Sequence, residues 1–492
     1  EHLHHQHGHL GAGFAADAYA RVKGLGLVCV TYCVGGFKLI NSMAGAYAEQ
    51  SPVLILSGAP GVKERRNGLL LHHASGPYES QLEMVKTITR ATACLDDPTT
   101  AGREIDRVLD AIAYHKQPGY IEIPRDIVDR NLKYDVYSQA LPDPIVLDQE
   151  NLDEATEKAI EWVQRAKNPV ILAGIEMARL DLGLPLMKFA ERSNIPIATT
   201  LLSKSIISER HPLSLGIYCG KSSKEHVKNV VENSDCVLML GVMQTDMNLG
   251  FKPFACNQTN VIMANIGRVR IRRSTYENVP FTYFMKNLLG ADISSKDNIS
   301  IPAKTTPTFT ANVGKPMTST RLFQKIDTIL DEGMAIIADI GGSLFGAIDL
   351  TVHHRNQFLS PAFYTSMGNS VPGALGVQTA FPNVRPIVVV GDGAFQMTGS
   401  EFSTIVRRNL NPIIIVLNNG GYGTERCLGH DGPFNDIQNW NYHFYPQLVG
   451  GGQGYLVNTE DELERAFSDA LANKKSASII NVILDKMDAT PA

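Results

Sequence analysis

Short runs of apolar, β-branched residues recur along the chain and alternate with longer segments whose apolar positions follow a helical spacing. Such runs suit buried parallel strands, and the amphipathic segments between them suit the helices that cover a parallel sheet. The clearest strands are predicted at residues 27–31, 53–57, 119–123, 169–173, 196–199, 236–240, 260–263, 335–338, 386–390 and 413–417. The alternation predicts an α/β protein with doubly wound parallel sheets.

Two polar segments divide this pattern into three blocks. Residues 132–150 and residues 292–317 are rich in proline and polar side chains, which indicates linkers. We therefore predict three parallel-sheet domains, at residues 1–131, 148–291 and 318–492, a number that suits a chain of 492 residues. No GxGxxG sequence follows the first strand of the central block, so the dinucleotide fingerprint is absent there.

Composition narrows the class of protein. Charged residues make up 19% of the chain and the formal net charge is −5, which argues against a nucleic-acid or anionic-membrane partner. No apolar run reaches the length of a membrane span, and the seven dispersed cysteines suit the reduced core thiols of a cytoplasmic protein. The chain opens without Met and directly before a predicted helix, so we expect that its natural beginning is missing.

Two motifs near the end of the chain each follow a predicted strand. Asp392 lies in a Gly-Asp-Gly sequence after the strand at 386–390, and Asn419 lies in Asn-Asn-Gly-Gly after the strand at 413–417. Open α/β sheets bind ligands at the carboxyl ends of their strands, so both side chains are expected at one site. A carboxylate and an amide oxygen are ligands that Mg²⁺ accepts beside phosphate oxygens.

The segment between these motifs is expected to help bind a phosphate group. Gly391 and Gly393 let the backbone approach closely, and a helix is predicted to begin near Thr398, which stands at capping-box spacing from Glu401. A further helix is predicted over residues 79–93 of the first block. The alternative for the Gly-Asp-Gly motif is an ordinary turn beside a chance pair of asparagines.

The spacing of these motifs resembles the thiamine diphosphate binding motif, and the whole chain resembles the pyruvate decarboxylase and indolepyruvate decarboxylase branch of thiamine diphosphate enzymes. The resemblance is carried by GFAADAYARVKG at 13–24, YAEQSPVLILSG at 47–58, LLLHHASG at 69–76, NPVILAG at 168–174 and GYGTE at 421–425. It implies a pyrimidine-binding first domain and a diphosphate-binding third domain. Because these come from different subunits in that family, it also implies a homodimer or homotetramer.

The resemblance also assigns roles to residues. Asp392, Asn419 and the carbonyl of Gly421 would hold Mg²⁺. The thiamine diphosphate contacts would come from Val34, Gly341, Gly342, Met367, Gly391, Gly393, Ala394, Asn419 and Tyr422. The implied reaction is the non-oxidative decarboxylation of a 2-oxo acid through the cofactor's ylide, which gives an aldehyde and CO₂. His72, His73 and Glu425 would handle protons.

One position departs from the family pattern. His9 stands where the family places a glutamate that hydrogen-bonds the cofactor's pyrimidine ring. Three interpretations stay open: a real substitution, a disturbed segment before Gly11, and a shifted register. His9 also lies four residues after His5, a spacing that would permit a metal on one helix face. A carboligase similar to acetolactate synthase and a catalytically weakened cofactor-binding paralogue are the alternative functions.

Overall fold

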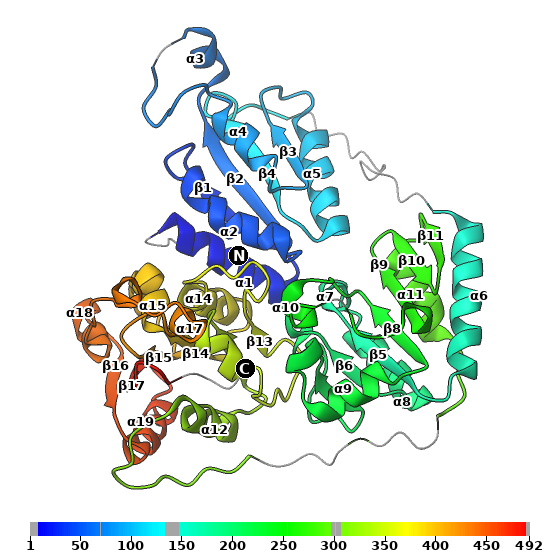
Figure 1. Cartoon of the computed structure of the whole chain (residues 1–492). Helices are drawn as coiled ribbons and strands as arrows, with labels where there is room; N and C mark the ends of the chain where they lie inside the picture. The colour runs from blue at the N-terminus through cyan, green and yellow to red at the C-terminus, as the bar shows by residue number, and fades with distance from the viewer. Residues whose placement is uncertain are drawn as a thin grey trace.

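The computed structural model describes residues 8–68, 70–132, 147–252, 254–296, 301 and 307–488 of the chain. His5, most of the first predicted linker and about a third of the second lie outside these residues. Figure 1 shows three bodies that follow one another along the chain, each with a sheet and helices around it. The predicted fold class, three α/β domains, is confirmed. The residue numbers at which the domains divide stay a prediction.

The first domain has a four-stranded parallel sheet in the order β1-β2-β4-β3. Its strands are β1 (Gly26–Val30), β2 (Val53–Ala59), β3 (Ala91–Cys94) and β4 (Gly119–Pro124). Its helices are α1 (His9–Lys23), α2 (Gly36–Ala48), α3 (Val62–Arg66), α4 (Ser80–Val85) and α5 (Ala101–His115). The helix predicted over 79–93 is wrong in its second half, because α4 ends at Val85 and residues 91–94 pair with β4 as an edge strand.

The central domain has seven strands in the order β11-β10-β9-β8-β5-β6-β7. Five strands are parallel: β5 (Pro169–Ala173), β6 (Ile197–Thr199), β7 (Ser214–Ile217), β8 (Cys236–Leu240) and β9 (Val261–Asn265). At one edge β10 (Arg268–Ile271) and β11 (Ser274–Glu277) add an antiparallel ribbon. The helices are α6 (Gln149–Arg165), α7 (Ile175–Arg179), α8 (Gly183–Ser193), α9 (Glu225–Glu232), α10 (Asp246–Leu249) and α11 (Phe281–Gly290).

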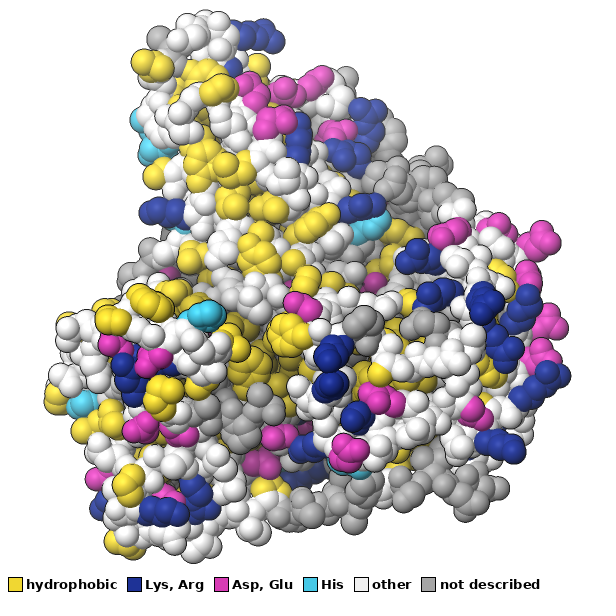
Figure 2. Space-filling model, viewed as in Figure 1, with side chains coloured by type: hydrophobic (Ala, Val, Ile, Leu, Met, Phe, Trp, Pro, Cys, Tyr) yellow, Lys and Arg dark blue, Asp and Glu magenta, His cyan; other side chains and the backbone are white. Residues whose placement is uncertain are grey.

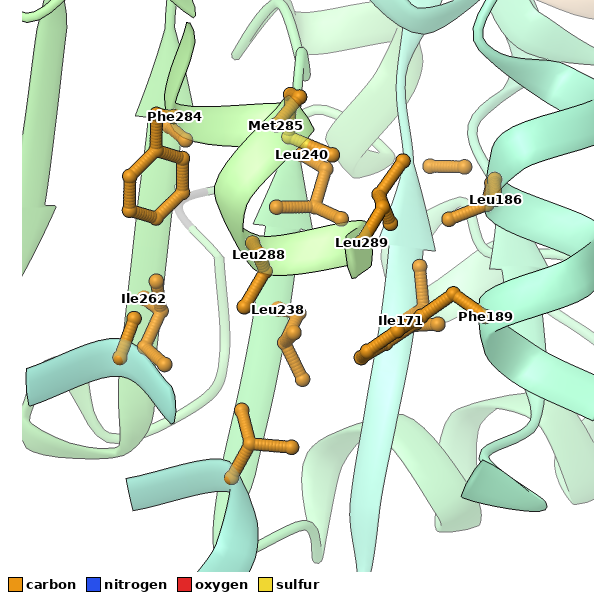
Figure 3. Close-up of a cluster of buried hydrophobic side chains, with 14 of the residues drawn as sticks. Ile171, Leu186, Phe189, Leu238, Leu240, Ile262, Phe284, Met285, Leu288 and Leu289 are labelled. Carbon is orange, nitrogen blue, oxygen red and sulfur yellow. The ribbon is translucent and has the colours of Figure 1, made fainter. Parts of the chain in front are cut away.

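The core of the central domain explains why its strands read as continuous apolar runs. Ile171, Leu238 and Ile262 from three adjacent strands lie under side chains of α8 and α11 (Figure 3). Phe189 and Phe284 supply the aromatic part of this layer, and both are fully buried. Helices cover both faces of such a sheet, so the two central strands, β5 and β8, are buried and apolar at every position.

The third domain has a six-stranded parallel sheet in the order β13-β12-β14-β15-β17-β16. Its strands are β12 (Met334–Ala338), β13 (Phe358–Leu359), β14 (Arg385–Gly391), β15 (Ile413–Asn418), β16 (Gln453–Val457) and β17 (Ser478–Ile483). Its helices are α12 (Ser319–Ile329), α13 (Gly342–Ala347), α14 (Ser370–Ala380), α15 (Asp392–Thr398), α16 (Phe402–Arg407), α17 (Gly423–Cys427), α18 (Tyr445–Val449) and α19 (Glu460–Ala472).

Helix α1 joins the first domain to the third. It packs along α14 (Figure 1), and Ala15 and Ala18 share one apolar core with residues of the third domain. Gly376 of α14 makes the close approach possible, because an added Cβ there would lie 2.2 Å from the carbonyl oxygen of Ala15. In the described part of the chain, no helix combines the length and the apolar character that crossing a bilayer requires.

Candidate functional site

The two motifs at the end of the chain meet at one edge of the third sheet. Strands β14 and β15 are adjacent and parallel, and Gly391 pairs with Leu417 in their register. Asp392 and Asn419 therefore leave the sheet side by side at its carboxyl edge. Helix α15 begins at Asp392 and ends at Thr398, and a 3₁₀ turn whose N-cap is Thr398 then leads into α16, so the helix predicted to begin near Thr398 is present but a further helix precedes it. Gly391 is the N-cap in an extended conformation, which lets the helix start directly at the strand end.

The carboxylate of Asp392 connects the two motifs. Its Oδ1 accepts the N–H of Gly393 at 2.7 Å, and its Oδ2 accepts the N–H of Gly421 at 3.0 Å. The residue is only 1% exposed. Burial raises the pKa of this carboxyl group to about 6, while the hydrogen bonds from the glycine N–H groups and the charge of Arg426 work in the other direction. A bound cation would offset this cost of burying the charge.

Three glycines bring the predicted cofactor residues into close contact. An added Cβ on Gly393 would lie 2.6 Å from the ring of Tyr422, and one on Gly341 would lie 2.9 Å from the hydroxyl of Thr424. Gly341 has a φ of +82°, a conformation that favours glycine. Gly342 begins α13, and the side chain of Ala394 is buried in the first turn of α15. Gly393 and Gly341 therefore both lie against the chain segment that begins α17.

Open space remains in front of part of this surface. An added Cβ on Gly391 or Gly420 would meet no atom within 4 Å, whereas one on Gly423 would lie 2.4 Å from Nδ2 of Asn419. The backbone of Gly391 and Gly420 is therefore approachable. Asn419 is half-buried, with its amide against Gly423.

Asp339 is a residue of this site that the sequence analysis did not single out. It follows β12, is fully buried, and accepts hydrogen bonds from the N–H groups of Ile340, Gly368 and Ser370 and from the Ser370 hydroxyl. Burial raises the pKa of its carboxyl group, against the effect of these hydrogen bonds. Asp339 thereby fixes the turn directly after the half-buried Met367. The hydroxyl of Thr398 donates to the carbonyl of Gly368 at 2.7 Å and holds the same turn.

The histidine pair lies in the loop between α3 and α4 of the first domain. His72 and His73 are exposed, with ring centroids 4.8 Å apart. The hydroxyl of Tyr32 donates to the carbonyl of His72, and the Thr31 hydroxyl lies 3.4 Å from Nδ1 of His73. The pair is therefore held against the segment that leads into the turn of Val34, which is 46% exposed.

A buried hydrogen-bond network supports that turn from below. Gln81 of α4 accepts the N–H of Cys33 at 2.5 Å and donates to the hydroxyls of Ser57 and Tyr120 at 2.8 and 2.7 Å. Tyr120 in turn donates to Glu122 at 3.0 Å. Because every polar atom of the Gln81 amide has a partner, the network fixes the backbone next to Val34.

His9 lies at the start of α1 and reaches the same turn. An added Cβ on Gly35 would lie 2.9 Å from Nε2 of His9. The N–H of Gly8 donates to Oε1 of Glu401 at 2.8 Å, so a buried carboxylate of the third domain caps this helix. The structure therefore places His9 against the backbone next to Val34.

Within one chain, the histidine pair His72–His73 is separate from Glu425 and from the predicted metal ligands. Among the described residues, no hydrogen bond, ion pair or ring contact links the pair His72–His73 to Glu425 or to the predicted metal ligands. Figure 1 shows α3 and the loop after it at the far end of the first domain, away from α15 and α17.

The donor set at Asp392 fits a hard cation beside a diphosphate. No cluster of three or more His, Cys, Asp or Glu able to hold a metal occurs in the described residues. A metal there would use one carboxylate, the amide of Asn419 and the carbonyl of Gly421, together with phosphate oxygens, which is the mixed oxygen set that Mg²⁺ accepts.

Comparisons with known proteins agree with this geometry. Three family models match: the N-terminal TPP binding domain, the central domain and the C-terminal TPP binding domain of thiamine pyrophosphate enzymes, over residues 3–84, 156–291 and 339–482. The chain is 32% identical to the indole-3-pyruvate decarboxylase of Azospirillum brasilense over 96% of this chain and 86% of the relative. It is 32% identical to the pyruvate decarboxylase of Candida glabrata and 30% identical to pyruvate decarboxylase isozyme 1 of Saccharomyces cerevisiae, each over 98% of this chain and 88% of the relative.

Proposed function

The chain belongs to the thiamine pyrophosphate enzymes, and we propose that it is a carboxy-lyase that converts a 2-oxo acid into an aldehyde and CO₂. The single observation that carries the proposal is that the buried carboxylate of Asp392 accepts the N–H groups of Gly393 and Gly421 at the carboxyl edge of β14 and β15. The histidine pair and the decarboxylase activity named for the relatives favour decarboxylation over carboligation.

Thiamine diphosphate and Mg²⁺ are the proposed cofactors. Asp392, Asn419 and the carbonyl of Gly421 would hold Mg²⁺, and the glycines of the third domain would receive the diphosphate. Met367 would contact the cofactor, while Val34 and His9 would contact its pyrimidine ring. When bound, thiamine diphosphate supplies the thiazolium ring that accepts the electron pair left by departing CO₂.

Side chains of the protein would carry out the proton transfers of the reaction. His72 and His73 lie together on a loop that the hydroxyl of Tyr32 holds in place, and imidazole side chains can act as general acid or base. Glu425 is exposed on α17, four residues after Gly421, and would face the histidine pair of a second subunit. His9 offers a ring nitrogen to the pyrimidine but no carboxyl group.

A homodimer or homotetramer is the proposed assembly. Exposed apolar side chains gather on the first domain and on the third, and Figure 2 shows several of them on the face of the first domain. They include Leu25, Leu27, Val34, Met84, Met397, Leu428, Phe434, Trp440 and Phe444. Burying them against a second copy would join the two halves of the site. A cytoplasmic location is also proposed, since all seven cysteines are free thiols.

Product analysis tests this function. Protein supplied with thiamine diphosphate and Mg²⁺ is incubated with pyruvate, indolepyruvate or phenylpyruvate, and the aldehyde and acetolactate are quantified separately. The proposal expects the aldehyde as the main product of at least one acid. Acetolactate as the main product would support a carboligase, and cofactor binding without turnover would support a catalytically weakened paralogue.

A further inference from the structure

The loop that carries the predicted metal ligands is held from behind by one buried guanidinium group. Arg426 lies in α17 directly after Glu425, and its side chain is 0% exposed. The carbonyls that accept its N–H groups are those of Gly420 at 3.1 Å, Asn435 at 3.3 Å, and Asn419 and Lys486 at 3.4 Å each. Two of these carbonyls belong to the segment that runs from Asn419 to Gly421.

The charge of Arg426 is balanced by two aspartates, one of which, Asp436, also pairs its backbone with Gly421 of the loop. Asp436 accepts from its Nη2 at 2.7 Å, and Asp431 lies 3.6 Å from its Nε. Asp436 is half-exposed and also pairs with Lys486 at 2.9 Å. A buried guanidinium costs free energy unless its donors are satisfied, so the loop carbonyls are required to keep their positions around it.

The loop itself has a shape that needs such support. Gly420 has a φ of +72° and Gly421 a φ of +147°, and both conformations favour glycine. An added Cβ on Gly421 would lie 1.9 Å from the carbonyl of Asn435 and 2.7 Å from Nη2 of Arg426. Arg426 therefore packs directly under the residue whose carbonyl is assigned to the metal, while Asp392 holds the N–H of that residue.

We propose that Arg426 is a positioning residue of the cofactor site: its guanidinium sets where the Asn419 amide and the Gly421 carbonyl stand relative to Asp392. Because Arg426 belongs to α17, it also fixes the helix that presents Glu425. This inference rests on the proposed function of the site. Outer groups that orient metal ligands commonly change metal affinity by about 10- to 100-fold when removed.

The same domain contains a matched control. Arg385 at the start of β14 is also buried, and its guanidinium donates to the carbonyls of Asn411, Ala470, Leu471 and Asn473. Arg385 makes the same kind of hydrogen bonds as Arg426, but at the amino end of the sheet, opposite the candidate site. Loss of Arg385 should weaken the domain without touching the metal loop.

The test is a calorimetric titration of Mg²⁺ into metal-free protein that is saturated with thiamine diphosphate, with the unfolding midpoint of the metal-free protein measured in parallel. Arg426→Met is expected to raise the Mg²⁺ dissociation constant at least about tenfold. Arg426→Lys should raise it less, roughly threefold, because an ammonium group reaches fewer of the carbonyls. Arg385→Met should lower the unfolding midpoint and leave the dissociation constant unchanged.

Two results would overturn the inference: wild-type Mg²⁺ affinity in folded Arg426→Met, or an equal loss of affinity in Arg385→Met. If Arg426→Met does not fold, the same titration is made with Asp436→Asn and Arg426→Lys. A wild-type Mg²⁺ dissociation constant in both variants would reject the positioning role. Wild-type protein that binds neither thiamine diphosphate nor Mg²⁺ would instead reject the proposed function, which separates the two failures.

Discussion

The carboxylate of Asp392 accepts the backbone N–H of Gly421 at 3.0 Å, and this bond joins the ends of two neighbouring strands. It places a buried acidic group beside the loop that carries an asparagine amide and an approachable glycine backbone. The proposed Mg²⁺ site follows from this relationship, because the oxygen ligands come from two chain segments that the sheet already holds together.

Replacing the Asp392 carboxylate tests the metal assignment. Asp392→Asn keeps the size of the side chain and removes its charge, so the Mg²⁺ dissociation constant is expected to rise at least about tenfold, which corresponds to about 1.4 kcal/mol. Asp327→Asn is the control, because Asp327 also accepts a backbone N–H in the third domain, that of Thr351 at 2.6 Å, away from the site. Equal Mg²⁺ binding by Asp392→Asn and wild type would refute the assignment.

The position of His9 predicts an effect on the cofactor itself. His9→Glu restores a carboxyl group beside the turn of Val34, so the exchange of the C2 hydrogen of bound thiamine diphosphate with deuterium should become faster, as measured by NMR after acid quenching. His9→Gln, which has no carboxyl group, is the matched control and should not accelerate exchange. Wild-type exchange rates in His9→Glu would show that this residue is not at the pyrimidine ring.

The network under the Val34 turn predicts a stability effect. Gln81→Leu would leave the buried N–H of Cys33 without its acceptor, so the free energy of unfolding is expected to fall by about 1–3 kcal/mol. Gln117→Leu removes one donor, to the Tyr47 carbonyl at 3.0 Å, and should cost less. Urea unfolding of the two variants compares these costs. A smaller loss in Gln81→Leu than in Gln117→Leu would contradict the network's role.

Acid sensitivity is predicted at Glu460, which is buried and pairs with Arg321 at 2.8 Å. The hydrogen bond from Arg321 is the main cause that lowers the pKa of Glu460 from 4.5 to about 2. A carboxyl group with a lowered folded-state pKa stabilises the fold above the unfolded value and loses this contribution as the pH falls. The stability difference between wild type and Glu460→Gln should therefore stay nearly constant from pH 6 to about 5 and shrink as the pH is lowered from 4.5 toward 2. A difference that stays constant over this range would exclude the pair as its source.

Ten strands could be predicted from the sequence because they are apolar, β-branched runs, and the meeting of Asp392 and Asn419 at one sheet edge could be predicted because both directly follow such runs. The edge strand at 91–94 was missed because Ala-Thr-Ala-Cys is short and weakly apolar. Asp339 and Arg426 were also missed. Their partners are backbone groups of Gly368 and Asn435, and no local pattern reveals which distant loop folds against a side chain.

The start of α15 shows a different limit. The spacing of Thr398 and Glu401 is typical of a capping box, and Thr398 is the N-cap of the turn that leads into α16, but the two side chains do not form the box and a separate helix begins earlier at Asp392. Tertiary contacts take both side chains: the hydroxyl of Thr398 donates to the carbonyl of Gly368, and Glu401 accepts the N–H of Gly8 at the start of α1. Local capping signals cannot anticipate acceptors and donors from distant parts of the chain.

The most direct test of the account is the release of labelled CO₂ from a 2-oxo acid that carries ¹³C at its carboxyl carbon. Wild-type protein should release labelled CO₂ in equal amount to the aldehyde, and only when both thiamine diphosphate and Mg²⁺ are present. Asp392→Asn should release far less at the same metal concentration. Release that does not depend on the cofactor, or no release from pyruvate, indolepyruvate or phenylpyruvate by protein with bound thiamine diphosphate, would contradict the account.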